Sequence, residues 1–424
     1  MKKLKTFSSL LKYKLLVLRY KLLHFFPTLI KKITRKRLNH TIANKINNHI
    51  SQQVDRHPKK NCIYIFQAQF FDSNGTNYFS GGAERYCRDL TALFLQQKFK
   101  VILIQCGNEK KDIWIKKQWG MTIVGIPANY NDYLKIIAKL KSSRLSIYSG
   151  YTHWGKQGDI HQPSILISHG VTWDTPHQNL DKKWLHQILQ KFTHIVSVDT
   201  NTLSYLRSTF SRELTYDTKE FSYIPNYVDH QIYHPIEKKQ NLTSQKIRIC
   251  FPRRLSDERG YWLFAPLVPT ILNKYQQVEV HFVGFAHGQK INNHLNGLLK
   301  KYKGRVKHSL IDQNKMQLIY QQSDISLIPT LYSEGTSLSC LEAMACKNTV
   351  IATNIGGLTN LIIDEFNGIL VNPNASELLK AIYKVLDSPK LREQLSNNAV
   401  SVSKVFSKEK WIAKWNAQLN QILR

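Results

Sequence analysis

The residues best suited to chemistry lie late in the chain, in the segment SEGTSLSCLEAMA from Ser333 to Ala345. An apolar run ends shortly before it, small residues follow, and a helix is predicted to begin there. The first backbone N–H groups of such a helix carry a partial positive charge and favour a phosphate. The residues concerned are Gly335, Thr336 and Ser337.

Two carboxylates accompany this predicted anion site. Glu334 lies in the turn, and Glu342 lies about one and a half turns into the helix. A carboxylate can accept two O–H donors, which suits the hydroxyl groups of a sugar or a ribose. The alternative is a helix that is merely capped by Thr336, with Glu342 in solvent.

Two arginines follow another predicted strand, in the segment RRLSDERG from Arg253 to Gly260. At the carboxyl end of a strand, Arg254 and Arg259 could hold a diphosphate from both sides. They would then neutralise the charge that grows on a departing nucleoside diphosphate. The alternative is a solvated loop of a basic protein.

Three weaker motifs also lie beside predicted strands or helices. Gly81 and Gly82 precede a helix, so the backbone there can approach a ligand closely. His169 follows the apolar run SILIS, although a single histidine is often structural. The segment IPNYVD, from Ile224 to Asp229, is a turn that leads toward a polar stretch.

The elements that must position these residues form two series. Strand-like runs, mostly apolar throughout, alternate with helical stretches from Cys62 onward, and the rhythm restarts after a polar segment at 237–246. Such runs are typical of parallel strands covered by helices on both faces. The sequence therefore predicts an α/β fold with two doubly wound, Rossmann-like domains and a ligand cleft at the strand ends. The expected strands are 63–66, 101–106, 122–126, 146–148, 165–168, 195–198 and 222–224, then 247–251, 278–283, 325–328, 350–352 and 369–371.

The predicted division of the chain follows from these series. A basic helical extension covers residues 1–60, the first domain 61–236, the linker 237–246, the second domain 247–407 and a final helix 408–424.

Taken together, the motifs fall in the order found in one family. The chain from about Cys62 onward resembles the retaining glycosyltransferase family 4 of glycosyl transferases group 1, which has the two-domain GT-B fold. The motifs that carry the resemblance are Gly81 to Arg85, His169 with Gly170, Pro225 to Asp229, Arg254 to Gly260, and Glu334 through Glu342.

The resemblance implies a role for each motif. Gly81 and Gly82 would lie near the donor diphosphate and the acceptor, and His169 near the transferred sugar. Arg254 and Arg259 would bind the diphosphate, Gly335 to Ser337 would complete that site, Glu334 would contact the sugar and Glu342 the ribose. The final helix would cross back onto the first domain.

The resemblance also implies the reaction. A sugar would pass from a nucleotide-diphosphate donor to a glycan or lipid-linked acceptor with retention of configuration, as in the synthesis of bacterial lipopolysaccharide or other surface polysaccharide. The departing phosphate would take the acceptor proton, so no general base is assigned. No cofactor and no metal are expected, since no cluster of metal ligands is evident.

Three residues depart from the family pattern. Arg253 and Tyr227 stand where glycine is common, and Asn360 stands where an acidic residue often follows the pair Gly356-Gly357. These departures leave the local loop shapes and the choice of donor open.

Charge and hydropathy bear on where in the cell the protein is expected to act. The net charge is +31, and residues 1–60 hold sixteen Lys or Arg against the single acid Asp55. A helix at 10–23 has leucines on one stripe, with basic residues beside them, so residues 1–60 could lie on an anionic membrane. Alternatively, that helix packs on the protein or on a partner. No signal peptide or membrane span is recognised, which predicts a cytoplasmic protein that is either free or peripheral at the inner face of the membrane.

The sequence leaves two alternative functions open. The charge would suit a nucleic-acid-binding protein, but basic residues interleaved with aromatic ones are not evident from Cys62 onward, so no nucleic acid partner is expected. A GT-B protein that binds glycans without activity is the other rival. The six cysteines are dispersed, which predicts buried, reduced thiols.

Overall fold

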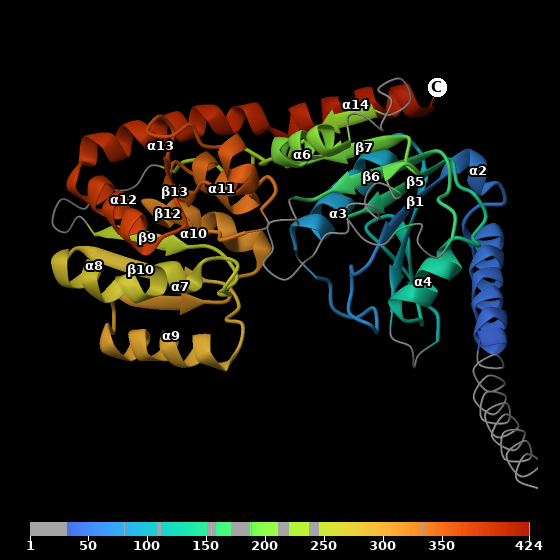
Figure 1. The fold of residues 1–424 in the computed structure, drawn as a ribbon, viewed down its shortest axis with the longest axis horizontal. Coiled ribbons are helices and arrows are strands. Elements are labelled where there is room, and N and C mark those ends of the chain that lie inside the picture. Colours follow the sequence, from blue (N-terminus) through green and yellow to red (C-terminus); the bar gives the residue numbers. More distant parts are fainter. Residues whose placement is uncertain are drawn as a thin grey trace, which may run out of the picture.

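A computed structural model describes residues 32–79, 81–107, 112–150, 154, 158–170, 187, 189–210, 220–236, 246–332 and 334–423. Two α/β domains lie side by side, and the last helices run along both of them (Figure 1). Residues 1–31, on which the predicted membrane helix falls, and 237–245, most of the predicted linker, lie outside the described residues.

The first domain is built on a sheet with the strand order β3-β4-β2-β1-β5-β6-β7-β8. All neighbouring pairs are parallel except β3 and β4, so the sheet is antiparallel at one edge, which differs from the predicted purely parallel sheet. The strands are β1 Cys62–Gln67, β2 Lys100–Cys106, β3 Trp114–Gln118, β4 Met121–Ile126, β5 Leu145–Ser149, β6 Ser164–Ser168, β7 His194–Ser197 and β8 Glu220–Tyr223. Its helices include one over residues 32–49, α2 Pro58–Asn61, α3 Gly82–Gln96, α4 Tyr130–Ile137 and α6 Thr200–Phe210, with a π-helical turn at Ile50–Val54.

Strand β1 shows why its apolar residues form a buried strand. Tyr64 and Phe66 pack into one hydrophobic cluster, while Ile63 and Ile65 pack into another on the opposite face. Successive side chains of a strand point to opposite faces, so a continuous apolar run is stable only where both faces are covered.

The second domain repeats this plan with the order β11-β10-β9-β12-β13-β14, and every pair is parallel. Its strands are β9 Ile247–Phe251, β10 Val278–Val283, β11 Val306–Ser309, β12 Ile325–Ile328, β13 Thr349–Thr353 and β14 Ile369–Val371. Its helices are α7 Tyr261–Phe264, α8 Val268–Lys274, α9 Gln289–Lys301, α10 Met316–Gln322, α11 Leu338–Ala345, α12 Ala375–Asp387 and α13 Pro389–Ser403. Short 3₁₀ turns lie at Ala265–Leu267, Gln313–Lys315, Gly356–Asn360 and Lys404–Phe406.

The segment 261–275 does not form one continuous helix. It is divided into α7, a 3₁₀ turn and α8, and the breaks fall beside Pro266 and Pro269. Proline has no N–H to donate and its ring clashes with the preceding turn, so it is tolerated only where a new helix begins.

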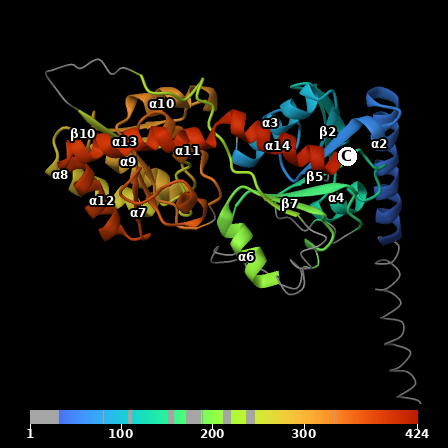
Figure 2. The same ribbon diagram turned by 90° about the horizontal axis from the view of Figure 1, so that it is seen from above.

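The final helix, α14 Lys408–Leu423, leaves the second domain and packs on the first. Figure 2 shows it lying beside α3. Trp411 and Trp415 are buried in a core cluster of the first domain, and Trp415 Nε1 donates to the hydroxyl of Tyr86 over 2.8 Å. Lys408 Nζ lies 2.8 Å from Asp229 Oδ2 at the start of this crossing. The chain therefore joins the two domains a second time.

The described part of the basic extension packs on the protein. The helix over residues 32–49 lies along the outer side of the first domain (Figure 1), and Ile42, Ala43 and Ile46 are buried there. Asn39 Nδ2 donates to Asp132 Oδ1 over 3.1 Å. Residues 39–50 thus pack on the first domain, whereas the helix at 10–23, for which the two alternatives were weighed, lies outside the described residues. Within the described residues, no helix is both long enough and apolar enough to span a membrane.

Candidate active site

A cavity of about 670 Å³ lies between the two domains, at the carboxyl ends of strands from both sheets. All ten residues predicted for the site line it, with three from the first domain and seven from the second. They are Gly81, Gly82, His169, Arg254, Arg259, Glu334, Gly335, Thr336, Ser337 and Glu342. The structure therefore brings together motifs that are as much as 261 residues apart in the sequence.

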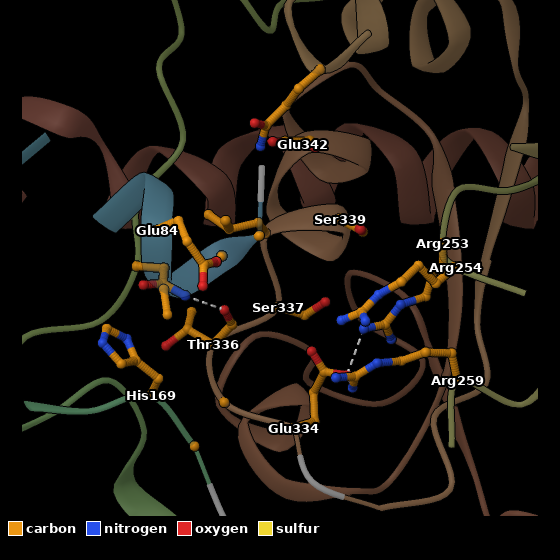
Figure 3. Close-up of a pocket in the computed structure, with 18 of the residues that line it drawn as sticks. Glu84, His169, Arg253, Arg254, Arg259, Glu334, Thr336, Ser337, Ser339 and Glu342 are labelled. Atoms are coloured by element: carbon orange, nitrogen blue, oxygen red, sulfur yellow. Dashed lines mark hydrogen bonds and ion pairs between the residues drawn. The ribbon is translucent and has the colours of Figure 1, made fainter. Parts of the chain in front are cut away.

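Glu334 is held by three donors within the second domain. Its Oε2 lies 2.7 Å from Arg253 Nη2 and 3.0 Å from Arg259 Nη1, and it accepts from Thr330 Oγ1 over 2.8 Å. Burial alone would raise the pKa of Glu334, but the two arginines hold it below its ordinary value. The carboxylate is therefore ionised, and its position is fixed (Figure 3).

Arg253 belongs to the site although it was noted only as a departure from the family pattern. Its side chain is 8% exposed and its guanidinium also donates to Thr330. An arginine buried this deeply needs a counter-charge, and Glu334 supplies it. The two adjacent arginines after β9 were visible in the sequence, but the local segment does not show that Glu334 is the partner of Arg253.

Arg254 and Arg259 differ in their surroundings. Arg254 is exposed and lines the cavity, whereas Arg259 is half-buried and paired with Glu334. Arg259 Nη1 is the atom that contacts Glu334. In Figure 3 both arginines face the opening turn of α11 across the cavity, with the Ser337 side chain pointing toward them.

The start of α11 is in contact with the first domain. Ser337 is its N-cap residue, the carbonyl of Thr336 accepts from Asn226 Nδ2 over 2.6 Å, and the hydroxyl of Thr336 donates to the carbonyl of Val198. The Ser337 hydroxyl is buried and has no hydrogen-bond partner within the described residues.

Two glycines make the backbone contact across the cleft possible. A Cβ on Gly335 would lie 2.4 Å from the carbonyl oxygen of His169, and a Cβ on Gly170 would lie 2.6 Å from the backbone nitrogen of Gly335. Gly170 also has a φ of +143°, which side chains disfavour. Only glycine fits at either position.

His169 is held neutral inside the cavity wall. Its Nε2 lies 2.8 Å from Ser149 Oγ, and its ring meets that of Tyr86 edge to face, with the centroids 5.3 Å apart. Burial lowers the pKa of His169 to about 4. At neutral pH the ring therefore carries no charge but can still donate or accept a hydrogen bond.

The glycine pair opens α3, and two charged residues follow it. Gly81 is the N-cap residue, and the carboxylate of Glu84 folds back so closely that a Cβ on Gly81 would lie 2.2 Å from Glu84 Oε2. Glu84 lines the cavity; burial raises its pKa, and hydrogen bonds together with the charge of Arg254 offset part of that rise. Arg85 Nη1 lies 2.6 Å from Glu342 Oε1 on the other domain. Neither residue was assigned a role from the sequence.

The other two departures from the family pattern are also explained by contacts. Tyr227 packs on Trp411, and its hydroxyl donates to Asp89 Oδ2 over 2.7 Å. The side chain of Asn360 accepts from the backbone N–H of Thr200 and donates to the hydroxyl of the same residue. An acidic residue could accept but not donate, so the amide suits this contact between the domains.

Metal-ligating side chains and cysteines also occur in the part of the chain that the structure describes. Within the described residues, no group of three or more His, Cys, Asp or Glu is arranged to hold a metal ion. The six cysteines form no disulfide, and all except Cys106 are buried, which agrees with the predicted buried thiols.

Comparison with solved structures places the fold in a class. Sucrose-phosphate synthase from Thermosynechococcus elongatus superposes with a TM-score of 0.68 at 18% identity, over 85% of this chain and 98% of that one. Alr3699/HepE of Anabaena, solved in complex with UDP, gives a TM-score of 0.64 at 15% identity, over 85% of this chain and all of the other. The fold is the two-domain GT-B fold of glycosyltransferases.

The second domain matches a known family. The match is to the family described as glycosyl transferases group 1 and covers residues 234–402. An uncharacterized glycosyltransferase of Methanocaldococcus jannaschii is 40% identical over 81 residues, which is 19% of this chain and 23% of that protein. The chain spans less than half the length of the curated relatives it matches. These matches do not distinguish family 4 within the group.

Proposed function

We propose that the protein is a retaining glycosyltransferase of family 4 that transfers a sugar from a nucleoside diphosphate donor. One observation carries this proposal. The paired arginines, the opening turn of α11, the two glutamates and His169 converge on one cavity between two domains with the GT-B fold. Ligands of open α/β sheets bind at the carboxyl ends of the strands, and here two such edges face each other.

In this proposal each wall of the cavity binds a different part of the donor. Arg254, Arg259 and the first N–H groups of α11 form the cationic side and would bind the diphosphate. Glu334 would accept from hydroxyls of the transferred sugar, and Glu342 from those of the ribose. His169, on the opposite wall, would position the sugar as a neutral group.

Catalysis in this scheme is stabilisation of the leaving group. As the bond from the sugar to the phosphate breaks, negative charge grows on the diphosphate, and the arginines and the helix dipole lie where that charge develops. Glu334 fixes Arg259 before the reaction, so little reorganisation is needed during it. The departing phosphate takes the acceptor proton, and neither a metal nor a general base is assigned.

The acceptor is proposed to be a glycan or a lipid-linked sugar of a bacterial surface polysaccharide or lipopolysaccharide, reached at the inner face of the cytoplasmic membrane. The first turns of the described N-terminal helix support a membrane contact, because Lys32, Lys36 and Arg37 are exposed there beside Ile33 and Leu38. Each basic residue near an anionic surface contributes about 1 kcal/mol.

A thermal-shift screen followed by a hydrolysis assay tests the proposal. Solved proteins with this fold carry UDP, UDP-glucose or ADP, so the screen uses UDP, GDP and ADP and their sugar conjugates. A ligand at about 100 times its Kd would stabilise the folded protein by about 2.7 kcal/mol. Binding with slow donor hydrolysis supports the proposal. Binding without any turnover would favour an inactive glycan-binding protein, and salt-sensitive oligonucleotide binding instead would contradict the proposal.

A further inference from the structure

The search for further function leads to the ion pair between Arg85 and Glu342. It joins the first turn of α3, in the first domain, to α11 in the second, across 257 residues of sequence. The atoms Arg85 Nη1 and Glu342 Oε1 are 2.6 Å apart, and the side chains are only 10% and 7% exposed. Glu342 lines the cavity and Arg85 does not, so the ion pair connects the cavity wall to a residue outside the cavity.

The position of Arg85 conflicts with its local environment. A cation in the first turn of a helix is repelled by the positive end of the helix dipole. Arg85 occupies that turn, and its backbone N–H donates to the carbonyl of Gly81 over 3.0 Å. Burial of the guanidinium is a second penalty. A cation that is disfavoured both by the helix dipole and by burial must be stabilised by a tertiary partner, and such positions are often functional.

Two segments outside α3 contact this arginine, α11 through Glu342 and the segment around Tyr233. Its guanidinium carbon lies 6.0 Å from the centroid of the Tyr233 ring, within range of a cation–π interaction. Tyr233 is buried, follows the turn that leaves the first domain, and meets the ring of Tyr320 with the centroids 6.1 Å apart. The pair therefore lies at the junction of the two domains and not on the surface of either.

We propose that Arg85 is a positioning residue that holds the Glu342 carboxylate for the ribose of the donor and makes nucleotide binding depend on contact between the two domains. The inference rests on the proposed function of the site, since it takes Glu342 as the ligand of the ribose. When the domains separate, Glu342 loses this partner, and the hydroxyls of the ribose lose an oriented acceptor.

The test measures binding of nucleotides with and without ribose hydroxyls. Full-length wild type, Arg85→Met and Arg85→Lys are titrated calorimetrically with UDP, GDP and ADP and with the 2′-deoxy and 3′-deoxy forms of the one that binds best. Hydrogen bonds to a charged group contribute enough that loss of the recognised hydroxyl should weaken wild-type binding on the order of tenfold.

Arg85→Met should weaken binding of the ribonucleotide to about the level of the deoxy form. Discrimination, meaning the ratio of the Kd of the deoxy form to that of the ribonucleotide, should then fall to about twofold or less. Arg85→Lys should keep part of this discrimination, because the charge remains. Arg88→Met is the matched control, since Arg88 lies on the same helix, is 31% exposed and pairs with its neighbour Asp89; its discrimination should equal that of the wild type.

A double-mutant cycle with Glu342→Gln completes the test. Because Arg85 acts on the ribose hydroxyl only through Glu342, the double variant should discriminate between the ribonucleotide and its deoxy form no less than either single variant. Unchanged discrimination in Arg85→Met, with a lower melting temperature, would reduce Arg85 to a structural role and overturn the inference. If the wild type binds none of the nucleotides, the proposed function itself fails, which is a different result.

Discussion

The two glutamates of the site are held in different ways. Glu334 is bound by Arg253, Arg259 and Thr330, all from its own domain, whereas Glu342 is bound by Arg85 from the opposite domain. The first arrangement is complete in the second domain alone, and the second exists only where the domains meet. One glutamate is thus organised by the fold of a domain and the other by closure of the cleft.

The difference separates two tasks. A group that acts on developing charge must be fixed before the reaction, because reorganisation at that moment raises the barrier. A group that recognises a ligand can be completed by a movement that the ligand itself favours. Glu334 with Arg259 fits the first task, and Glu342 with Arg85 fits the second.

The largest expected effect follows from removing Arg259. Arg259→Ala should lower kcat by about 100- to 1,000-fold while the Kd of the donor changes far less, because the contact tightens as charge develops on the diphosphate. Arg259→Lys keeps the charge and should retain more of the rate. The measurement is steady-state kinetics of donor turnover together with donor titration. Equal losses in rate and in affinity would show that Arg259 only binds the substrate.

The next effect concerns stability and compares the two glutamates directly. Glu334→Gln leaves Arg253 buried without a counter-charge inside one domain and should lower the free energy of unfolding by about 3 kcal/mol. In Glu342→Gln, opening of the cleft returns Arg85 to water, so the loss should stay below about 1 kcal/mol. Urea unfolding of both variants gives the two values. Similar losses would remove the distinction between the two carboxylates.

Much of the fold could be predicted because its strands are continuous apolar runs. The runs at 101–106 and 278–283 lie within one residue of β2 and β10. Strands β3 and β11 were missed because their residues, WIKKQ and VKHS, are short and rich in polar groups at the sheet edges. Edge strands bury less surface, so the hydrophobic pattern that marks a central strand is weak in them.

The residues of the candidate site also differ in how far the sequence could predict them. Residues that follow a strand or open a helix could be found from the local pattern, since strand ends meet at one edge of a parallel sheet. The partner of Arg85 could not, because it depends on how two separately folded domains face each other. Arg253 was visible in the sequence, but its role depends on Thr330 and Glu334, which follow a different strand of the sheet.

A smaller effect is expected at the hydrogen bond from Asn226 to the carbonyl of Thr336. This bond spans the domains beside the start of α11, so Asn226→Ala should act on closure and weaken nucleotide binding by about three- to tenfold. Asn201 is the matched control, because its Nδ2 also bonds across the domains, to the carbonyl of Gly356, but outside the cavity. Calorimetric titration of both alanine variants compares them. If Asn226→Ala has no more effect than Asn201→Ala, the start of α11 needs no support from the first domain.

The smallest effect is the response to acid, and it again compares a residue at the junction with one inside a domain. Burial lowers the pKa of His169 to about 4 at the cleft, and burial together with Arg248 and Lys307 lowers the pKa of His281 to about 4 in the second domain. An unfolded histidine has a pKa near 6.5, so between about pH 6.5 and 4 the unfolded state binds more protons.

Stability should therefore fall as the pH decreases through that window, while both histidines stay neutral and His169 causes no change in activity between about pH 6 and 8. His281→Asn should make the slope of unfolding free energy against pH shallower, because Arg248 and Lys307, which oppose protonation of His281, belong to the same domain and stay beside it when the cleft opens. His169→Asn should change that slope less, since opening of the cleft is enough to expose His169 to protons. Urea unfolding at a series of pH values gives both slopes, and equal changes would mean that the junction opens no more easily than the domain unfolds.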